Sequence, residues 1–121
     1  MTKGITTLCG SVRFKEAFDQ VNRDLTLAGW IVLAPGVWEH NRLHTSIYTS
    51  DKMVLDALHL DKILMSDSIV VINESDYVGE STHKELDFAV NNDKTIFWLH
   101  LPTKHHPFPY SDPLSWSKML E

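Results

Sequence analysis

The chain has 121 residues, of which 43% are hydrophobic and 22% are charged. This length suits a single domain with a sizeable core, and the composition excludes a mostly disordered chain, a collagen-like repeat and a coiled coil. The net charge is -5 and the 11 Lys and Arg residues are scattered, so we expect no binding to polymeric DNA or RNA, which requires a basic face.

The sequence also lacks the features of membrane and secreted proteins. No apolar run reaches the roughly 18 residues of a membrane span, and the first residues do not follow a signal-peptide pattern. The single cysteine, Cys9, cannot form an internal disulfide. These features predict a cytoplasmic protein with no membrane partner.

Predicted strands and helices alternate from the start of the chain. Ile5–Cys9 is a short β-rich run that predicts a buried strand, and Phe14–Ala28 has apolar residues at helical spacing, followed by Gly29 as a cap. Trp30–Leu33 predicts a second strand. The stretch from Val37 to Ser50 has no sustained period, and its length is typical of a functional loop.

The rest of the chain continues this alternation. The further predicted elements are a helix capped by Ser50 and running to about Ser66, a strand over Ser68–Ile72, a helix from Ser81 or Thr82 to about Asn92, a strand over Thr95–Leu99, and a short helix near Leu114–Leu120 in an otherwise irregular tail over 100–121. The pattern predicts one α/β domain over residues 1–121. Its expected fold is a flavodoxin-like or Rossmann-like three-layer sandwich around a parallel sheet of four to five strands.

In such a sheet, ligands bind at the carboxyl ends of the strands. The turn after the first predicted strand reads Cys9-Gly10-Ser11-Val12-Arg13. Gly10 allows close backbone approach, Ser11 offers a hydroxyl, and Arg13 can bind a phosphate. The turn is neither a G-x-G-x-x-G nor a Walker sequence. It is either a phosphate site or a tight turn in which Ser11 caps a helix.

A second candidate lies before the third predicted helix, at Gly79, Ser81, His83 and Glu85. Glu85 is expected in the first turn, where the helix N-terminus stabilises a charged carboxylate, which favours a nucleophile. Thr82-x-x-Glu85 also fits a capping box, which is a purely structural use of both residues. His83 faces either the site or solvent.

The second predicted helix carries His59 and Asp61. By helical spacing, Asp61 shares a face with the apolar residues Val54, Ala57, Leu58 and Met65. His59 and Asp61 are either site residues or structural and solvated groups.

We expect no metal and no cofactor. Glu39-His40 and His44 do not follow His-Glu-x-x-His, and the three further histidines at 100, 105 and 106 lack a defined fourth ligand.

Several of these residues together resemble a known family. Leu8-Cys9-Gly10-Ser11-x-Arg13, then Gly79, Glu85-Leu86-x-x-Ala89 and Lys94, resemble the nucleoside 2-deoxyribosyltransferase superfamily, which includes deoxynucleoside 5′-monophosphate N-glycosidases. The resemblance spans about Ile5 to Leu99 and is strongest to small bacterial and phage members. It implies a flavodoxin-like parallel sheet and a dimer or larger homo-oligomer.

The resemblance also implies residue roles. Glu85 maps onto the family nucleophile, which attacks C1′ of the deoxyribose and expels the base, as in retaining glycoside hydrolysis. Gly10, Ser11 and Arg13 map onto the turn that binds the 5′-phosphate. His59 stands where the family has an assisting aspartate. His59, Asp61 or His83 would then supply the proton to the leaving base.

The expected partner is a small nucleoside or nucleotide. Cys9, Gly79, Ser81 and His83 are further candidates for substrate contacts, and Trp38 either stacks on the base or packs in the core. The aromatic residues Trp98, Phe108, Tyr110 and Trp116 predict a homo-oligomeric interface. The alternative functions are a non-catalytic nucleotide sensor or sequestering module and, more remotely, a structural or assembly protein.

Overall fold

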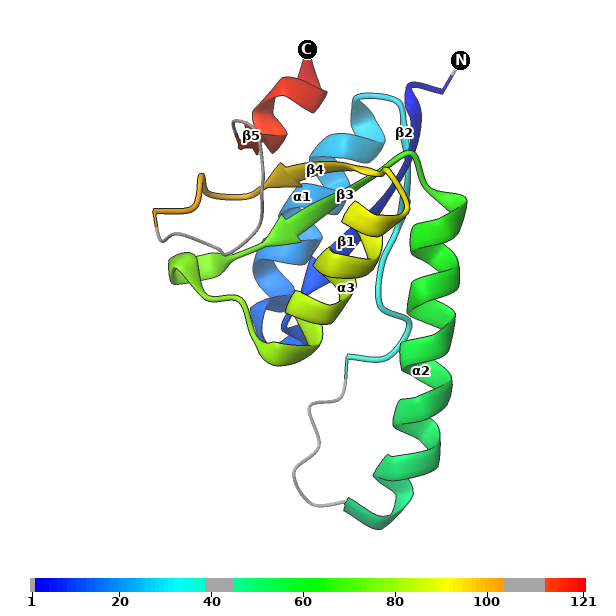
Figure 1. The fold of residues 1–121 in the computed structure, drawn as a ribbon. Helices are drawn as coiled ribbons and strands as arrows, with labels where there is room; N and C mark the ends of the chain where they lie inside the picture. Colours follow the sequence, from blue (N-terminus) through cyan, green and yellow to red (C-terminus); the bar gives the residue numbers. More distant parts are fainter. Residues whose placement is uncertain (1, 39–44, 104–112) are drawn as a thin grey trace.

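A computed structural model describes residues 2–38, 45–103 and 113–121, with the backbone alone at 45–49. Within these residues, five parallel strands form one sheet in the order β2-β1-β3-β4-β5 (Figure 1). The strands are β1 (Gly4–Gly10), β2 (Trp30–Leu33), β3 (Ser68–Ile72), β4 (Thr95–Trp98) and β5 (Leu114–Ser115); the helices are α1 (Lys15–Leu27), α2 (Thr45–Met65) and α3 (Glu80–Asn91), with short 3₁₀ turns η1 (Val12–Phe14), η2 (Glu74–Asp76) and η3 (Trp116–Leu120).

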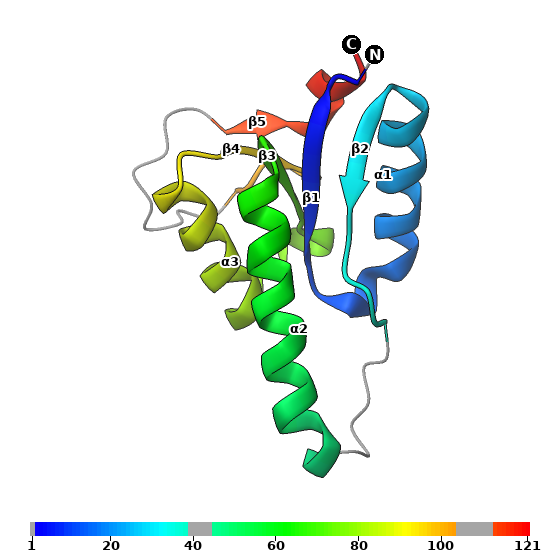
Figure 2. The same cartoon turned by 90° about the vertical axis from the view of Figure 1, so that its right-hand side faces the viewer.

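The helices cover both faces of the sheet, which makes three layers (Figure 2). Strand residues alternate between the two faces, so Leu8 and Val70 pack against α1, while Cys9 and Val71 pack against α2 and α3. The predicted α/β fold class is therefore confirmed. No helix in the described part of the chain is long and apolar enough to cross a membrane.

The strand order places a topological switch point between β1 and β3. The chain leaves β1 for β2 on one side and returns to β3 on the other, where Cys9 pairs with Val71 and Gly10 with Ile72. Crossovers that depart in opposite directions leave a crevice at the carboxyl ends of the two strands. The turn at Gly10 and the segment after Ile72 border this crevice.

Helix starts differ from the sequence expectations in two places. α2 begins at Thr45 rather than at Ser50, because no Gly or Pro between them interrupts the helix. α3 begins at Glu80 with Gly79 as its N-cap residue, so neither Ser81 nor Thr82 caps it. A side chain at position 79 would meet the Tyr77 hydroxyl at 2.9 Å, which explains the glycine.

The tail is more ordered than expected at its end. Leu114–Ser115 adds the two-residue strand β5 beside β4, and η3 follows it, in place of one helix over 114–120. Trp98 is buried in the core, which corrects its assignment to an interface. Trp116 packs partly buried against the α1 side of the core, and Phe108 and Tyr110 lie outside the described residues.

The buried face of α2 also differs from the apolar face that the spacing suggested. His59, Ile63 and Ser66 point into the molecule, whereas Val54 and Met65 are 58% and 64% exposed. Periodicity alone cannot identify the buried face here, because two different faces of α2 carry apolar side chains.

Candidate functional site

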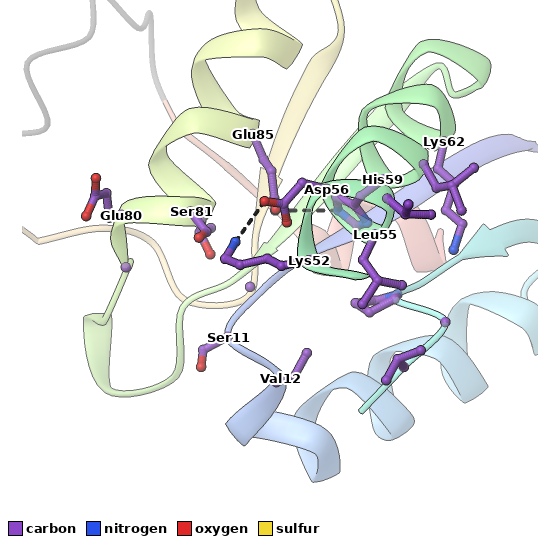
Figure 3. Close-up of a pocket in the computed structure, with 18 of the residues that line it drawn as sticks. Ser11, Val12, Lys52, Leu55, Asp56, His59, Lys62, Glu80, Ser81 and Glu85 are labelled. Atoms are coloured by element: carbon purple, nitrogen blue, oxygen red, sulfur yellow. Dashed lines mark hydrogen bonds and ion pairs between the residues drawn. The ribbon is translucent and has the colours of Figure 1, made fainter. Parts of the chain in front are cut away.

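A cavity of about 820 Å³ opens at the carboxyl ends of the strands (Figure 3). Side chains of α2 line one wall, and the start of α3 lines another. The residues that line the cavity are Gly10, Ser11, Val12, Pro35, Gly36, Val37, Asp51, Lys52, Val54, Leu55, Asp56, Leu58, His59, Lys62, Tyr77, Gly79, Glu80, Ser81, Thr82 and Glu85. The site therefore draws on the turn after β1, the segment after β2, the start of α3 and one face of α2.

Glu85 projects from α3 into this cavity. Leu86 and Ala89 anchor the helix in the core, which fixes the direction of the Glu85 side chain. The carboxylate lies 3.5 Å from the ring nitrogen Nε2 of His59, and its side chain is 17% exposed. Because α3 begins at Glu80, Glu85 lies beyond the first turn, and the capping box with Thr82 is not formed. The capping-box interpretation of Glu85 is therefore wrong.

Burial has opposite effects on the two partners of this contact. Desolvation, followed by the charge of Asp56, raises the pKa of Glu85 to about 8, although Lys52 acts against it. Desolvation, followed by Lys62, lowers the pKa of His59 to about 4. We expected the helix N-terminus to stabilise a charged Glu85, but desolvation and the charge of Asp56 have the larger effect and favour the protonated form. Near neutral pH the pair is largely uncharged, with a protonated carboxyl beside a neutral imidazole.

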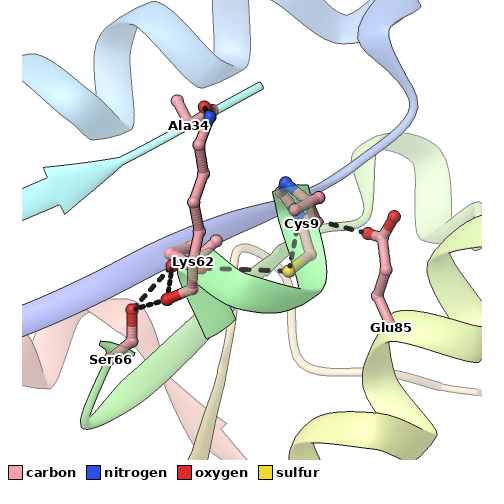
Figure 4. A network of polar contacts seen from close by, with 7 residues as sticks. Cys9, Ala34, Lys62, Ser66 and Glu85 are labelled. Atoms are coloured by element: carbon pink, nitrogen blue, oxygen red, sulfur yellow. Dashed lines mark hydrogen bonds and ion pairs between the residues drawn. The ribbon is translucent and has the colours of Figure 1, made fainter. Parts of the chain in front are cut away.

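Cys9 lies behind this pair, on β1 (Figure 4). Its thiol is fully buried and lies 3.4 Å from His59 Nε2. Desolvation and the neighbouring Glu85 raise the pKa of the Cys9 thiol well above its ordinary value. Cys9 is thus a buried neighbour of Glu85 and His59, and it is not among the described residues that line the cavity. The predicted substrate contact of Cys9 therefore stays a prediction, and its thiol reaches the cavity only through His59 and Glu85.

The turn after β1 combines a cap with an exposed guanidinium. Ser11 caps η1, and its hydroxyl accepts hydrogen bonds from the backbone N–H and from Nε of Arg13, at 3.4 Å and 3.0 Å. The exposed guanidinium of Arg13 lies 4.8 Å from the centre of the Tyr77 ring. Gly10 is required by packing, because a Cβ there would lie 2.9 Å from Ile72. Capping by Ser11 is confirmed, and Gly10 and Ser11 also line the cavity.

The N-terminus of α3 faces the same cavity. Gly79 carries no side chain that could cap the helix, and Gly79 to Thr82 all contribute to the lining. The first backbone N–H groups of a helix have no partner within it and favour an anion. Ser81 adds a hydroxyl beside them. This edge of the cavity is therefore suited to a phosphate or a carboxylate.

Three predicted site residues lie elsewhere. Asp61 is exposed on the outer side of α2, because a shift of two positions from His59 turns the side chain away. Trp38 packs edge-to-face on Phe18, 4.8 Å between ring centres, with the ammonium of Lys15 at 5.3 Å from its ring. His83 lies on α3. Within the described part of the chain, the cavity lining includes none of these three and does not include Arg13.

Several charged residues that line the cavity were not predicted as site residues, and Lys52 and Asp56 are the ones closest to Glu85 in their electrostatic effect. Lys52 and Asp56 line the cavity from α2 and form an ion pair at 2.7 Å (Figure 3). They precede His59 by seven and three positions, so helical spacing puts all three on one face. The sequence signal was present, but the face chosen for α2 was its apolar one. Lys62, one turn further along, donates a hydrogen bond to the Ala34 carbonyl at 2.7 Å and ties α2 to the end of β2 (Figure 4).

Comparison with known proteins places this fold. No protein-family model and no curated protein sequence matches the chain. Among solved structures, the chain is similar to a 2-deoxyribosyltransferase from Leishmania mexicana, with a TM-score of 0.60 and 16% identity over 92% of this chain and 76% of that one. The chain has a nucleoside 2-deoxyribosyltransferase-like fold. At this level of identity the likeness concerns the fold alone.

Proposed function

We propose that the protein cleaves the N-glycosidic bond of a small nucleoside or nucleoside 5′-monophosphate, with Glu85 as the nucleophile. The observation that carries this proposal is the position of Glu85. It is a largely buried carboxyl at the wall of a cavity of about 820 Å³, on a fold like that of a 2-deoxyribosyltransferase. A buried carboxyl in a ligand-sized cavity is typical of a catalytic group.

The chemistry needs Glu85 as a carboxylate. Its oxygen forms a bond to C1′ while the C1′–N bond breaks, and the electron pair leaves with the base, which takes up a proton. Water, or a second base in a transferase, then attacks C1′ and releases Glu85. Since burial raises the pKa of Glu85 to about 8, the active fraction grows as the pH rises through that value. Neutral His59 lies 3.5 Å from this carboxyl, and the leaving base takes its proton from water in the open cavity, because Asp56 is ion-paired with Lys52.

The edge of the cavity formed by the start of α3 and the turn after β1 is suited to the 5′-phosphate. The hydroxyls of Ser11 and Ser81 and the backbone amides that open α3 face the space there. Arg13 is exposed beside Ser11, and its long side chain can extend to an anion at the rim of the cavity. A guanidinium binds phosphate through two parallel hydrogen bonds. A nucleoside monophosphate would place its sugar between these groups and Glu85.

A second function is favoured by the protonation state of the same pair. Near neutral pH a protonated Glu85 is a poor nucleophile. A neutral His59 is at the same time a poor general acid. The protein would then bind a nucleotide without turnover, as a sensor or sequestering module. Both functions use the same cavity and differ in whether the base is released.

The deciding experiment measures base release and binding together. A panel of deoxynucleosides and their 5′-monophosphates is incubated with the protein at pH 7 and pH 9, and free base is quantified by chromatography. We expect release that is faster at pH 9, and a loss of about 10³-fold or more in Glu85→Gln, which cannot form the sugar ester. Calorimetry on Glu85→Gln should show that nucleotide binding survives.

Asp87→Asn is the matched control, because Asp87 is an exposed acid on α3 two residues beyond Glu85. It should release base at the parent rate. Parent-like release by Glu85→Gln would refute the nucleophile assignment. Nucleotide binding by the parent without release at either pH would establish the sensor function instead.

A further inference from the structure

Three groups with metal-binding chemistry meet at the inner end of the cavity. Cys9 comes from β1, His59 from α2 and Glu85 from α3, and their ligand atoms all lie within 4.8 Å of one another (Figure 4). Cys9 and His59 are buried, and Glu85 is mostly so. Because each residue is anchored on a different packed element, the cluster is held by the fold itself and not by one flexible loop.

Two of the three separations among these atoms match those of ligands around one tetrahedral ion, and the third, from Cys9 to Glu85, is no more than 4.8 Å. Zinc bonds of about 2.3 Å to sulfur and about 2.0–2.1 Å to nitrogen and oxygen place S and N ~3.6 Å apart, and N and O ~3.4 Å apart. The observed separations are 3.4 Å from Cys9 Sγ to His59 Nε2 and 3.5 Å from His59 Nε2 to Glu85 Oε1. The latter is long for a hydrogen bond but suits two atoms that share an ion.

The donor set selects the kind of ion. A thiolate, an imidazole and a carboxylate suit zinc and similar transition metals, whereas calcium and magnesium prefer oxygen ligands throughout. His59 and Glu85 also line the open cavity, so an ion can enter and a water can take a fourth position. Three protein ligands with one open position are the arrangement of zinc sites that exchange their fourth ligand.

We infer that Cys9, His59 and Glu85 form a binding site for Zn²⁺, with the fourth coordination position facing the cavity. Binding displaces the thiol proton of Cys9 and the carboxyl proton of Glu85 to solvent, so that both bind as anions. The linear spacing of the histidines could not indicate this site, because its ligands stand at positions 9, 59 and 85. One consequence rests on the proposed function. If Glu85 is the nucleophile, the bound ion withholds the Glu85 carboxylate from C1′ and inhibits base release.

Cobalt(II) provides the test, because its absorption reports both ligand type and geometry. Chelator-treated protein is titrated with Co²⁺ in the absence of any nucleotide. We expect one equivalent to bind, with tetrahedral d–d bands and a thiolate charge-transfer band, and Zn²⁺ to displace it. Since the chain has one cysteine, the charge-transfer band identifies Cys9 without any substitution. Absence of that band would overturn the site.

Variants then test the other ligands. Cys9→Ser and His59→Ala should weaken Zn²⁺ binding by more than the roughly ten- to hundredfold that loss of an outer-shell partner costs. His100→Ala is the control, because His100 is exposed and distant in sequence from the cluster, and it should bind as the parent does. Equal Zn²⁺ affinity in the parent and in both ligand variants would refute the assignment. If a variant fails to fold, the cobalt spectrum of the parent protein alone decides whether the site exists.

The inhibitory consequence is measured separately. Zn²⁺ at the concentration that saturates the cobalt-competition assay should stop base release, and a chelator should restore it. Base release that continues in the zinc-saturated protein would refute inhibition. If the protein shows the cobalt spectrum but releases no base under any condition, the metal site is supported and the proposed glycosidase activity is refuted.

Discussion

The two helical layers of the molecule differ in what they bury. The layer of α1 and η3 packs apolar side chains such as Phe18, Leu25 and Met119 against the sheet. The layer of α2 and α3 buries Ile63 and Leu86 but also the titratable cluster of Cys9, His59 and Glu85. Buried polar groups cost stability unless they are well paired. The comparison indicates that the α1 layer holds the fold, whereas the α2–α3 layer gives up stability to form the site.

The largest expected effect tests the α1 layer. Phe18→Ala removes a fully buried ring that also contacts Trp38, and it should lower the free energy of unfolding by about 3–5 kcal/mol. Denaturant unfolding followed by circular dichroism measures this loss. Leu27→Ala is the control, since Leu27 on the same helix is 74% exposed and its truncation should change stability by less than about 0.5 kcal/mol. Equal losses would contradict the importance of this layer.

The next effect tests how much free energy of unfolding the buried Glu85 carboxyl costs as the pH rises. The pKa of Glu85 is raised from its ordinary value of 4.5 to about 8, so the folded protein holds a proton that the unfolded chain releases. The stabilisation is fully present below pH 4.5 and is lost as the pH rises through about 8. Between pH 5 and pH 9 the parent should therefore lose roughly a few kcal/mol more than Glu85→Gln, which does not titrate. Parallel pH profiles for the two proteins would refute this prediction.

A smaller effect is expected for Arg13, and it tests whether the α1 side of the molecule also contributes to ligand binding. Arg13→Ala should weaken binding of nucleoside 5′-monophosphates by roughly ten- to hundredfold, because a charge-assisted hydrogen bond contributes about 1.5–3 kcal/mol. Binding of the unphosphorylated nucleosides should hardly change. Titration calorimetry compares the two ligand classes, with Arg23→Ala, an exposed arginine on α1, as the control. Equal weakening for both classes would remove Arg13 from the phosphate site.

The smallest change in stability is expected on the exposed apolar stripe of α2. Val54, Leu58 and Met65 are more than half exposed, and Val54 and Leu58 also line the cavity, so the stripe borders the site. Such an apolar stripe is typical of a subunit interface. We expect a homodimer through this stripe. Leu58→Lys should give a monomer in light scattering while changing unfolding by less than about 0.5 kcal/mol. Leu27→Lys on α1 should leave the mass unchanged, and a monomeric parent would contradict the prediction.

The sequence predicted the sheet well because each strand is a short apolar run between turn residues. Ser68–Ile72 and Trp30–Leu33 were both placed to the residue. Glu85, Ser11 and Gly79 were placed at the cavity because the ends of parallel strands converge. The start of each helix was less predictable, since a cap depends on backbone geometry, as Gly79 beside Tyr77 shows.

The face of α2 was the main feature that the sequence could not determine. Its most apolar face, with Val54 and Met65, points outward, and the buried face is centred on the polar His59. Tertiary contacts with β1 and α3 decide this orientation, and these contacts join residues far apart in the chain. The same limit hid Lys52 and Asp56, and it explains why Asp61 was chosen as the acid of the site.

The internal position of β1 has a consequence for how the chain folds as it is synthesised. β1 precedes the other strands in the chain, yet its Thr7 and Leu8 pair with Ile69 and Val70 in β3. One edge of β1 therefore waits for some sixty further residues to leave the ribosome before its hydrogen bonds can form. Pairings over such distances slow folding and leave a strand edge open to other chains in the interval. Until β3 is made, the edge of β1 that will face it has no partner strand.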